Sequence, residues 1–125
     1  MRRPVTLAQM LALLGLAAPG VSCGAAHCLL PPCPPTIALF INVTDAATGG
    51  PVNGAVVRIS GAAHDTMPCN LTCYEPGYAG TYVLDVEAPG FQSVHRTVGV
   101  EGTTPECGCP TVVAEHVSVT LVPDP

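Results

Sequence analysis

The sequence predicts an all-β domain of the sandwich type, preceded by an export signal, and three observations lead to this expectation. The chain of 125 residues contains 14 Pro and 13 Gly and only 10 % charged residues, a composition that disfavours helical bundles and coiled coils. Apolar and polar residues alternate with period two from Ile37 onward, as in half-buried strands. Turn-forming residues recur about every ten residues, which is typical of a β-sandwich.

Residues 1–22 have the order of regions found in a secretory signal peptide. Arg2 and Arg3 precede an apolar run from Val5 to Ala18, and the small and turn-forming residues 19–22 follow it. The run of about 14 residues is too short for a bilayer core, which needs about 20. We therefore expect an exported protein that is either soluble or lipid-anchored and does not span the membrane.

Cys23 is the expected lipidation site. The segment Gly20-Val21-Ser22-Cys23 resembles a bacterial lipobox, in which the cysteine thiol takes a diacylglyceryl group, although Gly20 stands where that pattern has Leu or a similar residue. The alternative is ordinary signal-peptidase cleavage after Ser22 or Ala26. The chain has seven cysteines, and an exported protein with an odd number leaves one unpaired. Lipidation of Cys23 leaves six, which favours the lipoprotein hypothesis.

Residues 23–36 are expected to form a tether that is rich in Cys and Pro. Four prolines in this segment give it polyproline character: Pro31, Pro32, Pro34 and Pro35. Such a chain is a semi-rigid spacer. It would hold the folded domain away from the membrane.

The folded domain is expected to span residues 37–123 and to contain five main strands. These strands are Ile37–Thr44, Ala55–Ser60, Thr81–Ala88, Phe91–Val100 and Val112–Val122. In the first strand Ile37, Leu39, Ile41 and Val43 share one face. The long connection 61–80 is expected to be pinned by its two cysteines and to add one or two short edge strands.

The order of these features resembles the carboxypeptidase regulatory-like family, which has a transthyretin-like (prealbumin-like) Greek-key β-sandwich of seven strands. The resemblance runs from Ile37 to Val122 and is carried by the segments 43–45, 48–57, 80–84, 86–91 and 117–121. It departs from the family at residues 69–77, where a Cys-containing loop replaces a short Asp-Gly hairpin. The resemblance implies a stand-alone module without catalytic residues, because this module generally lacks them and accompanies metallocarboxypeptidases, outer-membrane receptors and surface proteins.

Six further cysteines are expected to form disulfides. They are Cys28, Cys33, Cys69, Cys73, Cys107 and Cys109. One of the 15 possible connectivities joins the pair 69/73 to the pair 107/109 and leaves Cys28 for Cys33. Loops of about 35 residues closed in this way would each stabilise a small core by a few kcal/mol. Binding of zinc or copper(I) by these thiols is the alternative, although their spacings fit no common zinc ligand set.

Charge and side-chain spacing limit the function. The mature chain has two arginines, no lysine and nine carboxylates, so it has no basic face for nucleic acid or for anionic lipid headgroups. Two serine–histidine pairs, Ser93 with His95 and His116 with Ser118, suggest a nucleophile and a base. Side chains two residues apart on a strand project in parallel about 7 Å from each other, which exceeds hydrogen-bond reach. No catalytic residue is therefore expected.

The sequence thus predicts a non-catalytic binding or structural module at the cell envelope, with outer-membrane attachment through lipid or, alternatively, a secreted or periplasmic location. The expected partner is a protein or a glycan of the envelope, with no cofactor, no metal and no nucleic acid. The alternatives are a Cys/His metal-binding envelope protein and an enzyme of unknown class. Neither the ligand nor the oligomeric state follows from the sequence.

Overall fold

The computed structural model describes residues 32–125, which contain eight β-strands and no helix, and hence no helix able to cross a membrane. One compact unit comprises residues 33–105 and 109–125; a second unit falls mostly outside the described residues. The strands are β1 (Ile37–Asp45), β2 (Val56–Gly61), β3 (Asp65–Pro68), β4 (Thr72–Pro76), β5 (Gly80–Glu87), β6 (Val94–Thr103), β7 (Thr111–Val113) and β8 (Glu115–Leu121).

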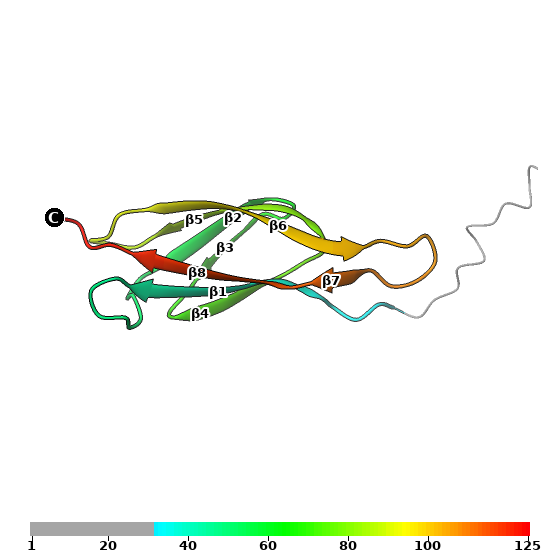
Figure 1. The fold of residues 1–125 in the computed structure, drawn as a ribbon, viewed down its shortest axis with the longest axis horizontal. Helices are drawn as coiled ribbons and strands as arrows, with labels where there is room; N and C mark the ends of the chain where they lie inside the picture. The colour runs from blue at the N-terminus through cyan, green and yellow to red at the C-terminus, as the bar shows by residue number, and fades with distance from the viewer. Residues whose placement is uncertain (1–31) are drawn as a thin grey trace, which may run out of the picture. The chain divides into compact units, whose positions relative to one another are not determined.

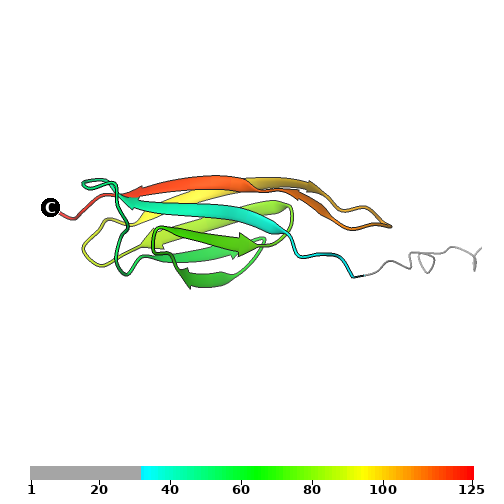
Figure 2. The same cartoon turned by 90° about the horizontal axis from the view of Figure 1, so that it is seen from below.

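The strands form two sheets with a shared core, so the predicted all-β sandwich is confirmed at that level (Figure 1). The smaller sheet has the order β4-β1-β8, and the larger sheet has the order β3-β2-β5-β6-β7. In the smaller sheet β1 pairs antiparallel with β4 and parallel with β8. Figures 1 and 2 both show β1 and β8 side by side along the length of the unit.

The strands at the edges of the two sheets include one prediction that is confirmed and one that is wrong. The connection 61–80 contributes two edge strands, as expected: β3 on the larger sheet and β4 on the smaller. The expectation of one final strand, Val112–Val122, is wrong, because the chain changes sheets at Ala114. Before Ala114 the backbone pairs with β6, and after it the backbone pairs with β1.

The fourth strand starts later than predicted, at Val94 instead of Phe91. Pro89 and Gly90 form a turn in which Gly90 has a φ of +81°, and the Phe91 amide donates to the Ala88 carbonyl. Phe91 then makes an isolated bridge to Pro123 near the C-terminus. The chain therefore rejoins the sheet only after it has completed this turn.

The core is made by alternate residues of both sheets, as the period-two pattern predicts, except at the start of β1, where the register shifts and Ala38 is buried while Ile37 is only half-buried. Leu39, Ile41 and Val43 of β1 are completely buried. The other sequence-predicted inner faces of β2, β5 and β8 are also buried: Ala55, Val57, Ile59, Tyr82, Leu84, Val86, Val117, Val119 and Leu121. Val94 and Val98 of β6 are only partly buried and pack against this core from its edge.

A buried carboxyl group joins the edge strands of the two sheets. Glu75 of β4 points inward and is 2 % exposed. Burial, together with a hydrogen bond and repulsion from the Asp65 carboxylate of β3, raises the pKa of Glu75 to about 7. Asp65 therefore favours the protonated form of Glu75, in which the two carboxyl groups can share a proton. Tyr82 closes the same region, and its hydroxyl donates to the Tyr78 carbonyl at 2.7 Å.

The register of β1 can be tested with two adjacent substitutions to aspartate. Ile41→Asp places a charge in the core and is expected to unfold the domain, at a cost of more than about 4 kcal/mol. Asn42→Asp lies on the exposed face and should change stability by less than about 0.5 kcal/mol. Thermal melts followed by circular dichroism measure both, and equal effects would contradict the register.

The buried carboxyl predicts that stability falls as the pH rises. The folded state keeps a proton on Glu75 up to a pKa of about 7, whereas the unfolded chain releases it near 4.5. The contribution of Glu75 to stability is therefore largest below pH 4.5 and declines between 4.5 and 7, by up to about 3 kcal/mol.

Glu75→Gln should remove this decline and be the more stable form at pH 8, because an amide in this buried position carries no charge at any pH. Urea unfolding at a series of pH values measures the effect, with the exposed Glu101→Gln as the matched control. A wild-type profile that is unchanged by Glu75→Gln would contradict the prediction.

Candidate functional site

The cysteines singled out in the sequence are held in disulfides wherever the structure describes them. Cys23 and Cys28 lie outside the described residues. The other five are all disulfide-bonded: Cys33, Cys69, Cys73, Cys107 and Cys109. Disulfides persist in oxidising compartments, so this chemistry indicates an exported protein. The expected pairing of these cysteines, however, needs correction.

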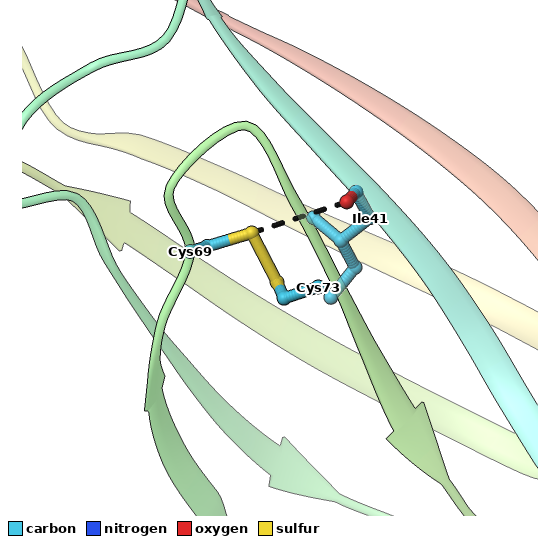
Figure 3. Close-up of a disulfide and its surroundings, with 3 residues drawn as sticks. All are labelled: Ile41, Cys69 and Cys73. Atoms are coloured by element: carbon cyan, nitrogen blue, oxygen red, sulfur yellow. Dashed lines mark hydrogen bonds between the residues drawn. A yellow bond between two sulfur atoms is a disulfide. The ribbon is translucent and has the colours of Figure 1, made fainter.

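Cys69 bonds to Cys73, and not to the 107/109 pair as predicted (Figure 3). The two residues flank the corner where the chain passes from β3 to β4, and their Cα atoms are 5.2 Å apart. Both point inward and are buried, and the Cys69 Sγ lies 3.9 Å from the Ile41 carbonyl oxygen. A disulfide sulfur carries no hydrogen, so this is a packing contact. Burial against β1 is what removes these sulfurs from reach of the β6–β7 loop.

Cys33 bonds to Cys109, so the predicted Cys28–Cys33 bridge is also wrong. Their Cα atoms are 5.4 Å apart, although 76 positions separate them in sequence. Cys33 lies four residues before β1, and Cys109 lies in the β6–β7 connection. The bond therefore fastens the end of the predicted tether to the body of the sandwich.

The two serine–histidine pairs have other partners in the structure. The Nδ1 of His95 on β6 is 2.6 Å from the Asp85 carboxylate on β5, and both side chains are exposed. His116 of β8 stacks on Phe40 of β1, with ring centroids 5.0 Å apart and planes inclined by 13°. Neither histidine is described as bonded to a serine hydroxyl. Within the described residues, no group of three or more His, Cys, Asp or Glu side chains is placed to hold a metal ion.

The outer face of the β4-β1-β8 sheet, which is the smaller sheet, carries rows of side chains that are not Asp, Glu, Lys or Arg. Strand pairing places Tyr74 opposite Phe40 and Phe40 opposite His116, which makes one aromatic row across three strands. The next row is made by Thr72, Asn42 and Ser118 in the same order of strands. Thr44 and Thr120 continue the array on β1 and β8, and Pro76 belongs to it on β4.

A shallow depression of about 360 Å³ lies between the aromatic row and the polar row. Its polar lining consists of Asn42, Thr72, Ser118 and His116, and Phe40 supplies an apolar wall. Each row spans two strand spacings, about 10 Å. The groups present are an amide, two hydroxyls and an imidazole, which donate and accept hydrogen bonds without a fixed charge.

The outer face of the larger sheet is chemically different, because it carries charged side chains that contact one another. Arg58 of β2 forms an ion pair with Glu87 of β5. Asp85, also on β5, holds His95. The guanidinium of Arg96 on β6 reaches the Ser118 carbonyl at 3.4 Å, at the border of the smaller sheet.

Sequence reasoning placed Asn42, His116 and Ser118 on exposed faces but did not find the array. The signal that exists in the sequence is the presence of aromatic residues at outward positions, namely Phe40 and His116. Their adjacency depends on the parallel pairing of β1 with β8, whose partners are separated by most of the domain.

The disulfide connectivity can be tested by peptide mapping without reduction. The map should contain the bridges Cys33–Cys109 and Cys69–Cys73. Replacing Cys33 and Cys109 together by serine opens the larger loop and should cost about 4 kcal/mol, which corresponds to a fall in Tm of roughly 20 °C. A peptide that joins Cys69 to Cys109 would contradict the structure.

Comparison with known proteins adds no family assignment, since neither a protein-family model nor a curated protein matches the chain.

Proposed function

We propose that the protein is an exported, non-catalytic binding module of the cell envelope, fastened to the membrane by lipid on Cys23. The observation that carries the proposal is the Cys33–Cys109 disulfide, which connects the tether covalently to the sandwich. A pull transmitted from Cys23 along the tether meets this bond before it reaches β1, which begins at Ile37. Without the bond, the same pull would peel the first strand from its sheet.

The number of cysteines supports the lipid anchor. Apart from Cys23, the chain has six cysteines, and five of them are disulfide-bonded in the structure. If Cys23 carries lipid, Cys28 is the sixth remaining cysteine, and six cysteines can all form disulfides. The alternative of metal binding through cysteine needs thiolates as ligands, and cysteines in disulfides supply none.

We propose further that the sandwich belongs to the carboxypeptidase regulatory-like family and has its transthyretin-like Greek-key topology. The two-sheet arrangement and the position of the motif residues support this assignment. Residues 43–45 end β1, residues 48–57 form the following turn and the start of β2, and residues 117–121 lie within β8. The Cys69–Cys73 corner replaces the family's short hairpin and is specific to this chain.

The binding role rests on the outer face of the β4-β1-β8 sheet. The chain has two phenylalanines and three tyrosines, and it places Phe40 and Tyr74 in one outward row, where Tyr74 is 59 % exposed. On the outer face of the larger sheet, Arg58 pairs with Glu87 and Asp85 contacts His95, so these groups already have partners. The smaller sheet therefore offers the better surface for recognition.

The lipid anchor predicts that Cys23 controls membrane partition. Wild-type protein should enter the detergent phase in a phase separation, because several acyl chains give stable anchoring. Cys23→Ala should stay in the aqueous phase, with mass spectrometry of the mature N-terminus as a second measurement. Cys28→Ala is the matched control and should still partition with detergent. A wild-type N-terminus without lipid would overturn the anchor.

A further inference from the structure

We propose that the outer face of the β4-β1-β8 sheet binds a neutral saccharide, with the depression between its aromatic and polar rows as the contact site. This inference rests on the proposed binding function and names the class of ligand. It depends on three properties of the face: its charge, its hydrogen-bonding groups and its shape.

The first property is the absence of formal charge on the array. The outward residues of the three described strands are Phe40, Asn42, Thr44, Thr72, Tyr74, Pro76, His116, Ser118 and Thr120. None is Asp, Glu, Lys or Arg, although the chain as a whole has a net charge of −5. Arg96 reaches only the border of the face, where it donates to a backbone carbonyl. Such a face does not attract phosphorylated or acidic ligands, and it matches an uncharged one.

The second property is the type of hydrogen bonding that is available. Asn42 offers both a donor and an acceptor, and the hydroxyls of Thr72 and Ser118 flank it at the same level of the sheet. Side chains of this kind suit adjacent hydroxyl groups, each of which donates and accepts. A purely apolar ligand would leave these groups without partners, at a cost in binding free energy.

The third property is the row of aromatic rings beside the polar row, in which Phe40 offers apolar surface and His116 offers both a ring face and polar ring nitrogens. The stacked rings of Phe40 and His116 stand together at 5.0 Å, and Tyr74 extends the same row on the edge strand. A sugar ring has polar hydroxyls along its rim and C–H groups on its faces. It therefore contacts apolar ring surface and hydrogen-bonding side chains at once, which is the combination found along this depression.

The aromatic row has a stabilising role as well, and the experiment must separate the two. Cross-strand aromatic pairs stabilise sheets by about 1 kcal/mol even when nothing binds to them. A loss of one exposed ring should therefore leave the protein folded. Binding and stability can be measured independently on the same variants.

The test uses the full exported protein in a detergent without a sugar headgroup. Chitohexaose, cellohexaose and maltoheptaose serve as neutral probes, and a heparin-derived hexasaccharide serves as the charged comparator. In an NMR titration, we expect at least one neutral probe to shift the amide resonances of Asn42, Thr72 and Ser118, with a Kd of about 1 mM or tighter. The charged comparator should leave these resonances unchanged.

Matched pairs of variants then locate the site. Tyr74→Ala and His116→Ala should each weaken binding about tenfold. The controls are Tyr78→Ala and His95→Ala, which remove exposed side chains elsewhere on the molecule and should change the Kd less than twofold. Thermal melts confirm that all four variants are folded at the titration temperature.

Three results would overturn the inference: no shift with any neutral probe, equal weakening by the control variants, or self-association through this face in sedimentation equilibrium. The partition experiment on Cys23 can be interpreted independently of each of these results. Membrane partition without sugar binding overturns the saccharide site alone. Sugar binding by a protein that stays in the aqueous phase overturns the anchor alone.

Discussion

The burial of one side of β1 is the constraint on which the rest of the structure depends. Leu39, Ile41 and Val43 are completely buried, and β1 is the central strand of the smaller sheet. Because side chains alternate along a strand, burying these three fixes Phe40 and Asn42 on the opposite side. A shift of one residue would expose the core and bury the amide. The register that stabilises the fold is thus the register that builds the outer face.

The two sheets use their outer faces differently. On the larger sheet Arg58 and His95 each contact a carboxylate of β5, so these polar groups already have partners within the protein. On the smaller sheet the polar groups are neutral, and the amide and hydroxyls stand in a row across the strands. Neutral polar groups lose less on desolvation than charged ones do. The smaller sheet is consequently the face from which a ligand displaces water at lower cost.

Covalent and polar links hold the parts of the sandwich that the hydrophobic core does not reach. The Cys69–Cys73 bridge closes the corner between the edge strands, and Asp65 of β3 raises the pKa of the buried Glu75 of β4. Cys33–Cys109 fastens the segment before β1. A domain of this length buries a modest core, so such links provide a large part of its stability. Of these links, only the one through Glu75 makes the stability of the β3–β4 side depend on pH.

The sequence alone determined the inward faces of β1, β2, β5 and β8, because the period-two pattern is local and needs no knowledge of neighbours. Leu39, Ile41 and Val43 could be assigned to the core from their spacing. The turn at residues 48–54 and the odd number of cysteines were also visible. The location of Cys23 in a signal-like context gave the anchor hypothesis, which remains a prediction.

Only the tertiary structure decided which of these elements meet. Cys69 bonds to Cys73 because the β3–β4 corner buries both sulfurs against β1, whereas spacing in the sequence allowed several partners equally. The aromatic row exists because β8 returns to lie parallel beside β1, and the chain between them leaves no local trace of that pairing. The raised pKa of Glu75 likewise needs Asp65 and the surrounding core. Which strands lie side by side depends on the fold of the whole chain, whereas the alternation of apolar and polar residues along a strand is local.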